Sequence, residues 1–200
     1  MAELSLDDLV ANRTMSRAMQ ATLTAIATKR RSYLVIALPR MAGKSTVGRA
    51  ILALAKADGA VVRELGEDGT DVASLAAEAR GGYLYVPEVS RVPVTAGYVW
   101  GAPVRAAFAV IKDGTSLSTA LHADSPRDAL DVLAQNRIPA EDLARLDAIV
   151  HIRSLGDDWR APTRRVIAGV YEMREGAPTP LHIWDELKDR FEEIAKPTRL

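Results

Sequence analysis

Gly43, Lys44, Ser45 and Thr46 directly follow a short apolar run and form the most informative segment of the chain. Gly-Lys-Ser between a buried strand and an amphipathic helix is the closing half of the signature of a phosphate-binding loop. A glycine lets the backbone approach a phosphate, and free N–H groups at the start of a helix point at the anion. The lysine adds a point charge, and the serine hydroxyl is a Mg²⁺ ligand. The segment therefore predicts a site for a nucleotide and Mg²⁺.

The predicted loop runs from the end of a strand to the first turn of a helix. Its expected nucleotide-binding residues are Pro39, Arg40, Met41, Ala42, Gly43, Lys44, Ser45 and Thr46. The full signature opens with a glycine where this chain has Leu38, and a left-handed backbone would be strained at a leucine. The alternative interpretation is that Gly43 and Ser45 simply begin a helix. Only six of the 26 basic residues are lysines, which favours a specific role for Lys44.

Two hydrophobic patterns alternate along the chain and predict the elements that position this loop. Short continuous apolar runs predict strands over 33–38, 60–65, 83–86 and 115–121. Helical spacing predicts helices over 44–58, 71–79, the second half of 97–112, 126–135 and 140–146. Strands that alternate with helices through short connections form a parallel sheet covered on both faces. The predicted class is therefore α/β.

The two ends of the chain have a different pattern. Residues 4–29 predict two helices, or one helix with a break, and residues 183–194 predict an amphipathic helix. The runs 148–153 and 165–171 flank a polar turn and predict an antiparallel hairpin. We therefore divide the chain into an N-terminal helical segment (1–30), a core (31–175) and a C-terminal helix with a tail (176–200).

Composition excludes several classes of site. The 200 residues include no cysteine, which excludes disulfides, thiolate zinc sites, iron–sulfur clusters and a cysteine nucleophile. The formal net charge of zero argues against a protein that binds nucleic acid through bulk electrostatics. No stretch approaches the roughly 20 apolar residues of a membrane span, and the acidic N-terminus is not a signal peptide. These observations predict a cytoplasmic protein without a transmembrane segment.

A second informative segment extends from Ser118 to Leu130. It reads Thr-Ala-Leu-His-Ala-Asp-Ser from Thr119 to Ser125 and is followed by a helix that opens with an acidic residue and an alanine. This pattern resembles the histidine box of the type II/type IV secretion ATPase superfamily, which includes the type IV pilus motors and the secretion traffic ATPases. The phosphate loop matches the family's Gly-Pro-Thr-Gly-Ser-Gly-Lys-Ser-Thr at Pro39 and from Gly43 onward. The resemblance covers about residues 15–175. It implies a RecA-like P-loop NTPase with a mostly parallel twisted sheet and an antiparallel hairpin near the C-terminus.

Two acidic segments lie where this family has functional boxes. The run 83–89 resembles the Walker B strand, in which Glu88 matches the glutamate, Pro87 replaces a glycine and Ser90 takes the position of an arginine. Glu67, followed by an aspartate, resembles the family's acidic box, and Glu64 is the rival candidate. The resemblance implies that Ser45 and Glu88 organise Mg²⁺ and that Glu64 or Glu67 polarises the attacking water. It also implies that His122 senses the γ-phosphate.

The function implied by the resemblance is ATP hydrolysis by a motor domain of a pilus or secretion system. The alternative is a regulatory or interaction module that binds a nucleotide without hydrolysing it. A small-molecule kinase is a weaker possibility, because the chain shows no lid or basic cluster for a second substrate. The family also implies self-association into a ring, usually of six subunits, and partners in the secretion or pilus machinery at the inner face of the membrane.

Overall fold

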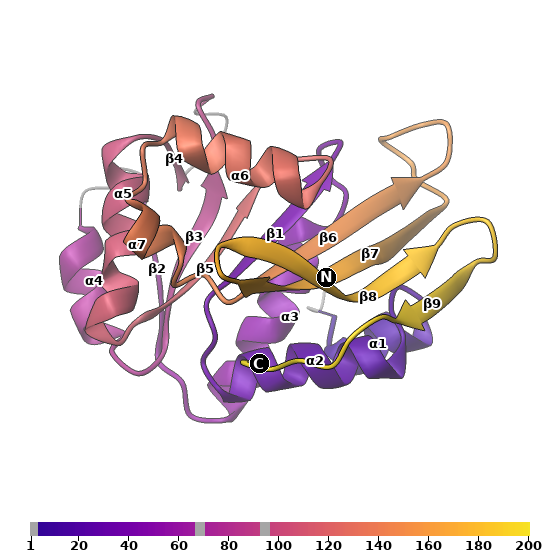
Figure 1. The fold of residues 1–200 in the computed structure, drawn as a ribbon, viewed down its shortest axis with the longest axis horizontal. Helices are drawn as coiled ribbons and strands as arrows, with labels where there is room; N and C mark the ends of the chain where they lie inside the picture. Colours follow the sequence, from indigo (N-terminus) through magenta and orange to yellow (C-terminus); the bar gives the residue numbers. More distant parts are fainter. Residues whose placement is uncertain (1–3, 67–70, 93–96) are drawn as a thin grey trace.

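The computed structural model describes residues 4–66, 71–92 and 97–200, which form one mixed sheet with helices on both faces (Figure 1). The helices are α1 (Leu6–Ala11), α2 (Arg17–Thr28), α3 (Lys44–Ala57), α4 (Val72–Glu78), α5 (Ala102–Ala109), the 3-10 turn η1 (Val110–Asp113), α6 (Pro126–Gln135) and α7 (Ala140–Leu143). The strands are β1 (Tyr33–Leu38), β2 (Val62–Glu64), β3 (Tyr83–Val89), β4 (Tyr98–Val99), β5 (Ser116–Leu121), β6 (Ala148–Leu155), β7 (Arg164–Arg174), β8 (Ala177–Asp185) and β9 (Arg190–Glu193).

The sheet has a parallel half and an antiparallel half that meet at β6. Its strand order is β2-β3-β5-β1-β6-β7-β8-β9, and β4 pairs with β3 outside this sequence. The strands from β2 to β6 run parallel, whereas β7, β8 and β9 each run antiparallel to the preceding strand. Because β1, β3 and β5 are parallel, Leu38, Val89 and Leu121 all lie at one edge of the sheet. The predicted α/β class, parallel sheet and C-terminal hairpin are confirmed.

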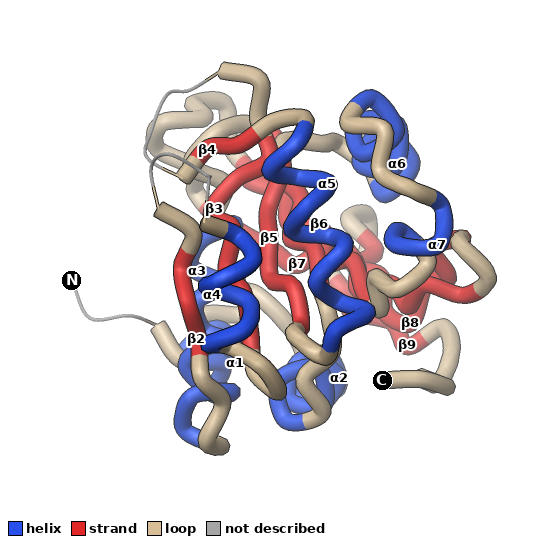
Figure 2. The backbone as a smooth tube through the Cα atoms, turned by 90° about the vertical axis from the view of Figure 1, so that its left-hand side faces the viewer, coloured by secondary structure: helices blue, strands red, loops and turns tan. Residues whose placement is uncertain are grey.

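Each face of the sheet has its own hydrophobic core. Helices α1, α2 and α3 cover one face (Figures 1 and 2), where Leu23 and Ile51 belong to the same core as Val35. Helices α4 to α7 cover the other face, where Phe108 and Leu133 belong to the same core as strand residues. A strand that is covered on both faces needs apolar side chains at every position. This explains why β1 reads as an uninterrupted apolar run.

The predicted amphipathic helix over 183–194 is wrong. This segment contains the end of β8, a turn and β9, which form an antiparallel hairpin. Trp184 pairs with Phe191 across the two strands, and Leu187 in the turn is 99% exposed. The apolar residues fit helical spacing because two cross-strand partners in a tight hairpin also lie several residues apart. In contrast, the expectation of two helices over 4–29 is confirmed by α1 and α2.

The last residues of the chain are fastened to the sheet by a buried carboxylate. Glu172 on β7 is 0% exposed and accepts hydrogen bonds from the backbone N–H groups of Thr198, Arg199 and Leu200, at 2.9, 2.6 and 3.1 Å. Lys29, directly after α2, donates to the Leu200 carbonyl at 2.9 Å. The C-terminus therefore lies beside α2 (Figure 1).

Among the described residues, no helix has the length and apolar character needed to cross a bilayer.

Candidate functional site

The predicted phosphate loop connects β1 to α3 and lines a pocket of about 720 Å³. Gly43 precedes α3 with φ +105°, in the left-handed region that favours glycine. A Cβ atom on Gly43 would also lie 3.2 Å from Cδ of Arg165 on β7. Leu38 is not among the residues with positive φ, so the strain predicted for leucine there does not arise. The left-handed backbone falls instead at Met41, with φ +63°, and at Gly43.

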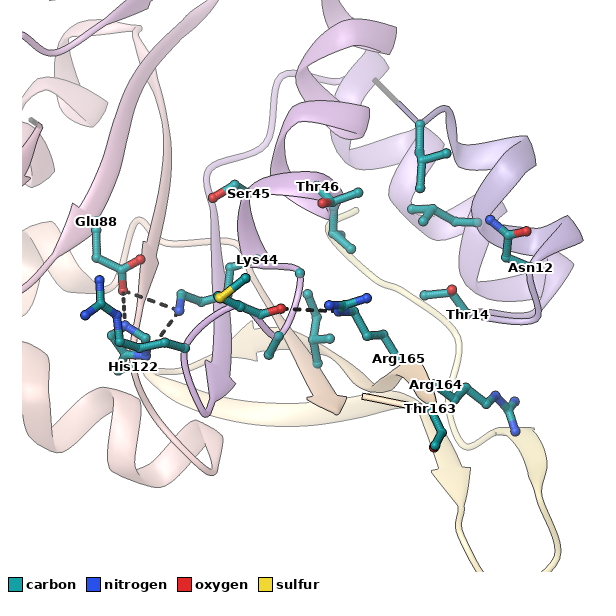
Figure 3. A pocket seen from close by; sticks show the side chains of 18 of the residues that line it. Asn12, Thr14, Lys44, Ser45, Thr46, Glu88, His122, Thr163, Arg164 and Arg165 are labelled. Carbon is teal, nitrogen blue, oxygen red and sulfur yellow. Dashed lines mark hydrogen bonds and ion pairs between the residues drawn. The ribbon is translucent and has the colours of Figure 1, made fainter. Parts of the chain in front are cut away.

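Three predicted site residues converge at one end of this pocket (Figure 3). Lys44 is the first residue of α3, Glu88 lies near the end of β3, and His122 directly follows β5. The Lys44 Nζ atom lies 3.2 Å from His122 Nδ1 and 3.6 Å from Glu88 Oε1. His122 Nε2 lies 3.7 Å from the same Glu88 oxygen. The structure thus brings together residues from three separate motifs at the carboxyl edge of the parallel strands, where open α/β sheets bind ligands.

Burial disfavours the charged form of each of these three groups. Lys44 is 6% exposed and Glu88 is 4% exposed. Burial raises the pKa of Glu88 to about 7, although the Lys44 charge opposes the shift. Burial, together with the Lys44 charge, lowers the pKa of His122 to about 4. Burial also lowers the pKa of Lys44, against the charge of Glu88. At neutral pH His122 is therefore uncharged and accepts a hydrogen bond from Lys44 through Nδ1.

The oxygen atoms beside Lys44 suit a hard cation such as Mg²⁺. The Glu88 Oε1 atom is buried and has no hydrogen-bond partner among the described residues, and Ser45 lines the same pocket. Carboxylate and hydroxyl oxygens, with substrate phosphates, are the ligands that Mg²⁺ takes in nucleotide sites. Glu88 and Ser45 therefore fit the metal that the sequence predicts.

The acidic-box candidates do not join this group within the described part of the chain. Glu64 is exposed at the end of β2 and lines a separate pocket of about 290 Å³, together with Arg49, Lys56 and Tyr85. Glu67 lies outside the described residues. A strand directs successive side chains to opposite faces, so a sequence motif near a strand end does not settle which face its carboxylate occupies.

Arg165 and Tyr98 are among the residues that line the main pocket without having been predicted. Arg165 on β7 donates from Nε to the Met41 carbonyl at 3.2 Å, and this bond joins the antiparallel half of the sheet to the phosphate loop (Figure 3). Tyr98 on β4 lines the same pocket. The pair of arginines at the start of the second hairpin arm was the only sequence signal for Arg165. The two-residue strand β4 is too short to give Tyr98 a periodic signal.

Comparison with known proteins gives no match in sequence: no family model and no curated protein matches the chain. Two solved structures are similar in three dimensions. The VirB11 ATPase from the Brucella suis type IV secretion system, in complex with sulphate, has a TM-score of 0.52 at 18% identity. The Legionella pneumophila ATPase DotB has a TM-score of 0.59 at 13% identity. The fold is that of these ATPases. This likeness confirms the predicted P-loop ATPase fold and, at the level of fold, the resemblance to secretion ATPases.

The comparison also shows how much of each neighbour the chain matches. The similarity covers 86% of this chain and 59% of the VirB11 chain, and 94% of this chain and 53% of the DotB chain. The chain therefore spans little more than half the length of either ATPase.

Proposed function

We propose that this protein binds MgATP and hydrolyses it to ADP and phosphate, as an ATPase domain of the secretion and pilus motor type. The observation that carries the proposal is the convergence of Lys44, Glu88 and His122 beside the start of α3, in a pocket large enough for a nucleotide. The fold shared with VirB11 and DotB supports it.

Each residue has a role that follows from its chemistry. Lys44 and the N–H groups of residues 39–46 would hold the β- and γ-phosphates, for which Lys44 turns from Glu88 and His122 towards the anion. Glu88 and Ser45 would hold Mg²⁺, which neutralises charge that develops on the phosphate oxygens. His122 would donate to, and so report, the terminal phosphate once Lys44 has moved. Arg40 lines the pocket and adds positive charge near the loop.

The acidic box would polarise the attacking water. General-base catalysis requires a carboxylate within hydrogen-bond reach of that water. Glu67 and Glu64 are the two proposed candidates. Because Glu64 lines the separate pocket, its side chain would have to turn towards the phosphate loop to take this role.

A second candidate function is a nucleotide-binding regulatory or interaction module that does not hydrolyse ATP. The position of Glu64 favours this alternative, because no acidic-box carboxylate of the described residues stands beside Lys44. Pro87 and Ser90, which replace a glycine and an arginine of the family's pattern, favour it as well.

The first experiment tests nucleotide binding through thermal unfolding. A ligand at 100 times its Kd stabilises the folded state by about 2.7 kcal/mol, which shifts the melting temperature by several degrees. We expect MgATP to produce this shift in the wild type and not in Lys44→Ala. Lys56→Ala is the matched control, because Lys56 is an exposed lysine near the other end of the same helix. An unchanged melting temperature at millimolar MgATP would reject the phosphate loop.

The second experiment separates the two candidate functions. Phosphate release from ATP alone is expected for an ATPase. Binding that depends on Lys44, with no phosphate release at any protein concentration, would instead establish the regulatory module.

We further propose that the protein acts in the cytoplasm, at the inner face of the membrane, with secretion or pilus machinery as partners. The VirB11 structure supports this proposal, because it comes from a type IV secretion system.

We also propose self-association into a ring. Identical head-to-tail contacts in a ring require two different complementary surfaces on each subunit.

A further inference from the structure

Strand β4 places Tyr98 next to Glu88 in the main pocket. The strand has only two residues and pairs in parallel with the end of β3, with Tyr98 opposite Glu88 and Val99 opposite Val89. Neighbouring strands lie about 4.8 Å apart, and residues in register point to the same face of the sheet. Both Tyr98 and Glu88 line the same pocket. Tyr98 therefore lies at the end of the pocket where Lys44 and His122 meet Glu88.

Contacts on both sides hold β4 in this position. The Ser90 N–H donates to the Val99 carbonyl at 3.0 Å, and the Val99 side chain is 5% exposed. The Gly101 N–H donates to the Asn136 side-chain oxygen at 2.7 Å. On the other side of Tyr98, a Cβ atom on Gly97 would lie 2.7 Å from Pro87 Cγ, so only glycine allows this close approach. The Tyr98 side chain lies between these contacts, so the backbone fixes its position. A ligand site requires side chains that are held in place in this way.

A neutral hydrogen-bond donor at Tyr98 complements the charged groups beside Glu88. Lys44 supplies charge, and Glu88 supplies an oxygen that is buried without a hydrogen-bond partner in the described part of the chain. A phenol hydroxyl donates a hydrogen bond without adding a charge. It can serve a phosphate oxygen beside a carboxylate, because it does not form an ion pair with that carboxylate as Lys44 does.

We propose that Tyr98 binds the terminal phosphate of the nucleotide by donating its O–H to a γ-phosphate oxygen. This inference rests on the proposed binding of ATP at the phosphate loop and adds a residue to it. The position of Tyr98 beside Glu88 and Lys44 indicates that it contacts the terminal phosphate rather than the nucleoside. The opposite end of the pocket, where a nucleoside would lie, is lined by Leu9, Asn12 and Thr14 from α1 and its connection to α2.

The test compares ligands that differ only at the γ-position. The variant is Tyr98→Phe, which keeps the ring and removes the hydroxyl group. The probes are MgADP and MgADP with aluminium fluoride, which occupies the γ-phosphate position, and Kd is measured by calorimetry. Hydrogen bonds to charged groups are strong enough that we expect about tenfold weaker binding of the fluoroaluminate complex by Tyr98→Phe. The Kd for MgADP should stay within about twofold of the wild type, because that ligand lacks the contacted group.

Tyr171→Phe provides the matched control. Tyr171 on β7 is a half-buried tyrosine that does not line the main pocket, so its loss should leave both affinities unchanged. An equal preference for the fluoroaluminate complex in Tyr98→Phe and the wild type would overturn the inference, while the proposed function would stand. If the wild type binds neither ligand, the proposed function fails and the inference fails with it. Melting temperatures of the two variants confirm that both are folded.

Discussion

Replacing Glu88 with glutamine is expected to remove a pH-dependent cost from folding. Burial raises the pKa of Glu88 in the folded chain to about 7, whereas the ordinary value is 4.5. Between these two pH values the unfolded chain has lost a proton that the folded chain still holds, so the free energy of unfolding falls as the pH rises. Each pKa unit corresponds to about 1.4 kcal/mol. The contribution of Glu88 to the free energy of unfolding is therefore fully present below pH 4.5, and about 3 kcal/mol of this stability is lost by pH 8.

The assay is urea unfolding of the wild type and Glu88→Gln between pH 4.5 and pH 8. The quantity of interest is the difference in free energy of unfolding between the two proteins at each pH. Groups that are common to both proteins and do not contact residue 88 cancel in this difference, including His151 and His182, whose pKa values are lowered by burial. We expect the difference to move by about 3 kcal/mol in favour of Glu88→Gln as the pH rises across this range.

The control for this assay is Glu64→Gln, which changes an exposed carboxylate at the end of β2. Substitutions at exposed sites usually change stability by less than about 0.5 kcal/mol. A stability difference between the wild type and Glu88→Gln that stays constant with pH would refute the reasoning. It would show that Lys44 compensates fully for the burial of the carboxylate and keeps it ionised.

Three further outcomes are expected. His122→Gln should show the opposite pH dependence in urea unfolding. Its free energy of unfolding should rise relative to that of the wild type by about 2 kcal/mol between pH 7 and pH 4. The reason is that burial lowers the pKa of His122 to about 4, so the unfolded chain binds the proton first as the pH falls. An unchanged difference would contradict this. Gly43→Ala should lower the free energy of unfolding by about 1–2 kcal/mol and abolish the melting shift with MgATP, since the φ of +105° is unfavourable for alanine; a normal shift would argue against backbone contacts with phosphate. In light scattering the purified protein should be a monomer or weak oligomer, with ATPase activity that rises more than linearly with concentration. A stable hexamer at micromolar concentration, or a specific activity independent of concentration, would contradict a site completed by weak association.

The sequence predicts those elements well in which the pattern of buried residues is regular along the whole element. Strand β1 is apolar at every position because helices cover both of its faces, and α3 repeats its apolar residues with helical spacing. The ends of parallel strands meet at one edge, so motifs near Gly43, Glu88 and His122 could be expected to converge before their distances were known.

The remaining features depend on contacts between distant segments. The hairpin of β8 and β9 was predicted as a helix, because Trp184 and Phe191 satisfy both patterns and only their pairing decides between them. Tyr98 is invisible to periodicity, because β4 exists only through its pairing with β3. Arg165 reaches the phosphate loop from a strand more than a hundred residues later in the chain, through a bond to a backbone carbonyl that no side-chain motif records.

The fastening of Glu172 to the C-terminal residues has a mechanical consequence. Strand β7 is tied down at Glu172 and touches the phosphate loop through Arg165, seven residues earlier in the chain. At roughly 3.3 Å per residue these two points lie about 23 Å apart along an extended strand. Because β7 is hydrogen-bonded to β6 on one side and to β8 on the other, the sheet holds these two points in a fixed relation. The Met41 carbonyl is therefore anchored, through Arg165, to a strand whose other end is fixed by the last residues of the chain.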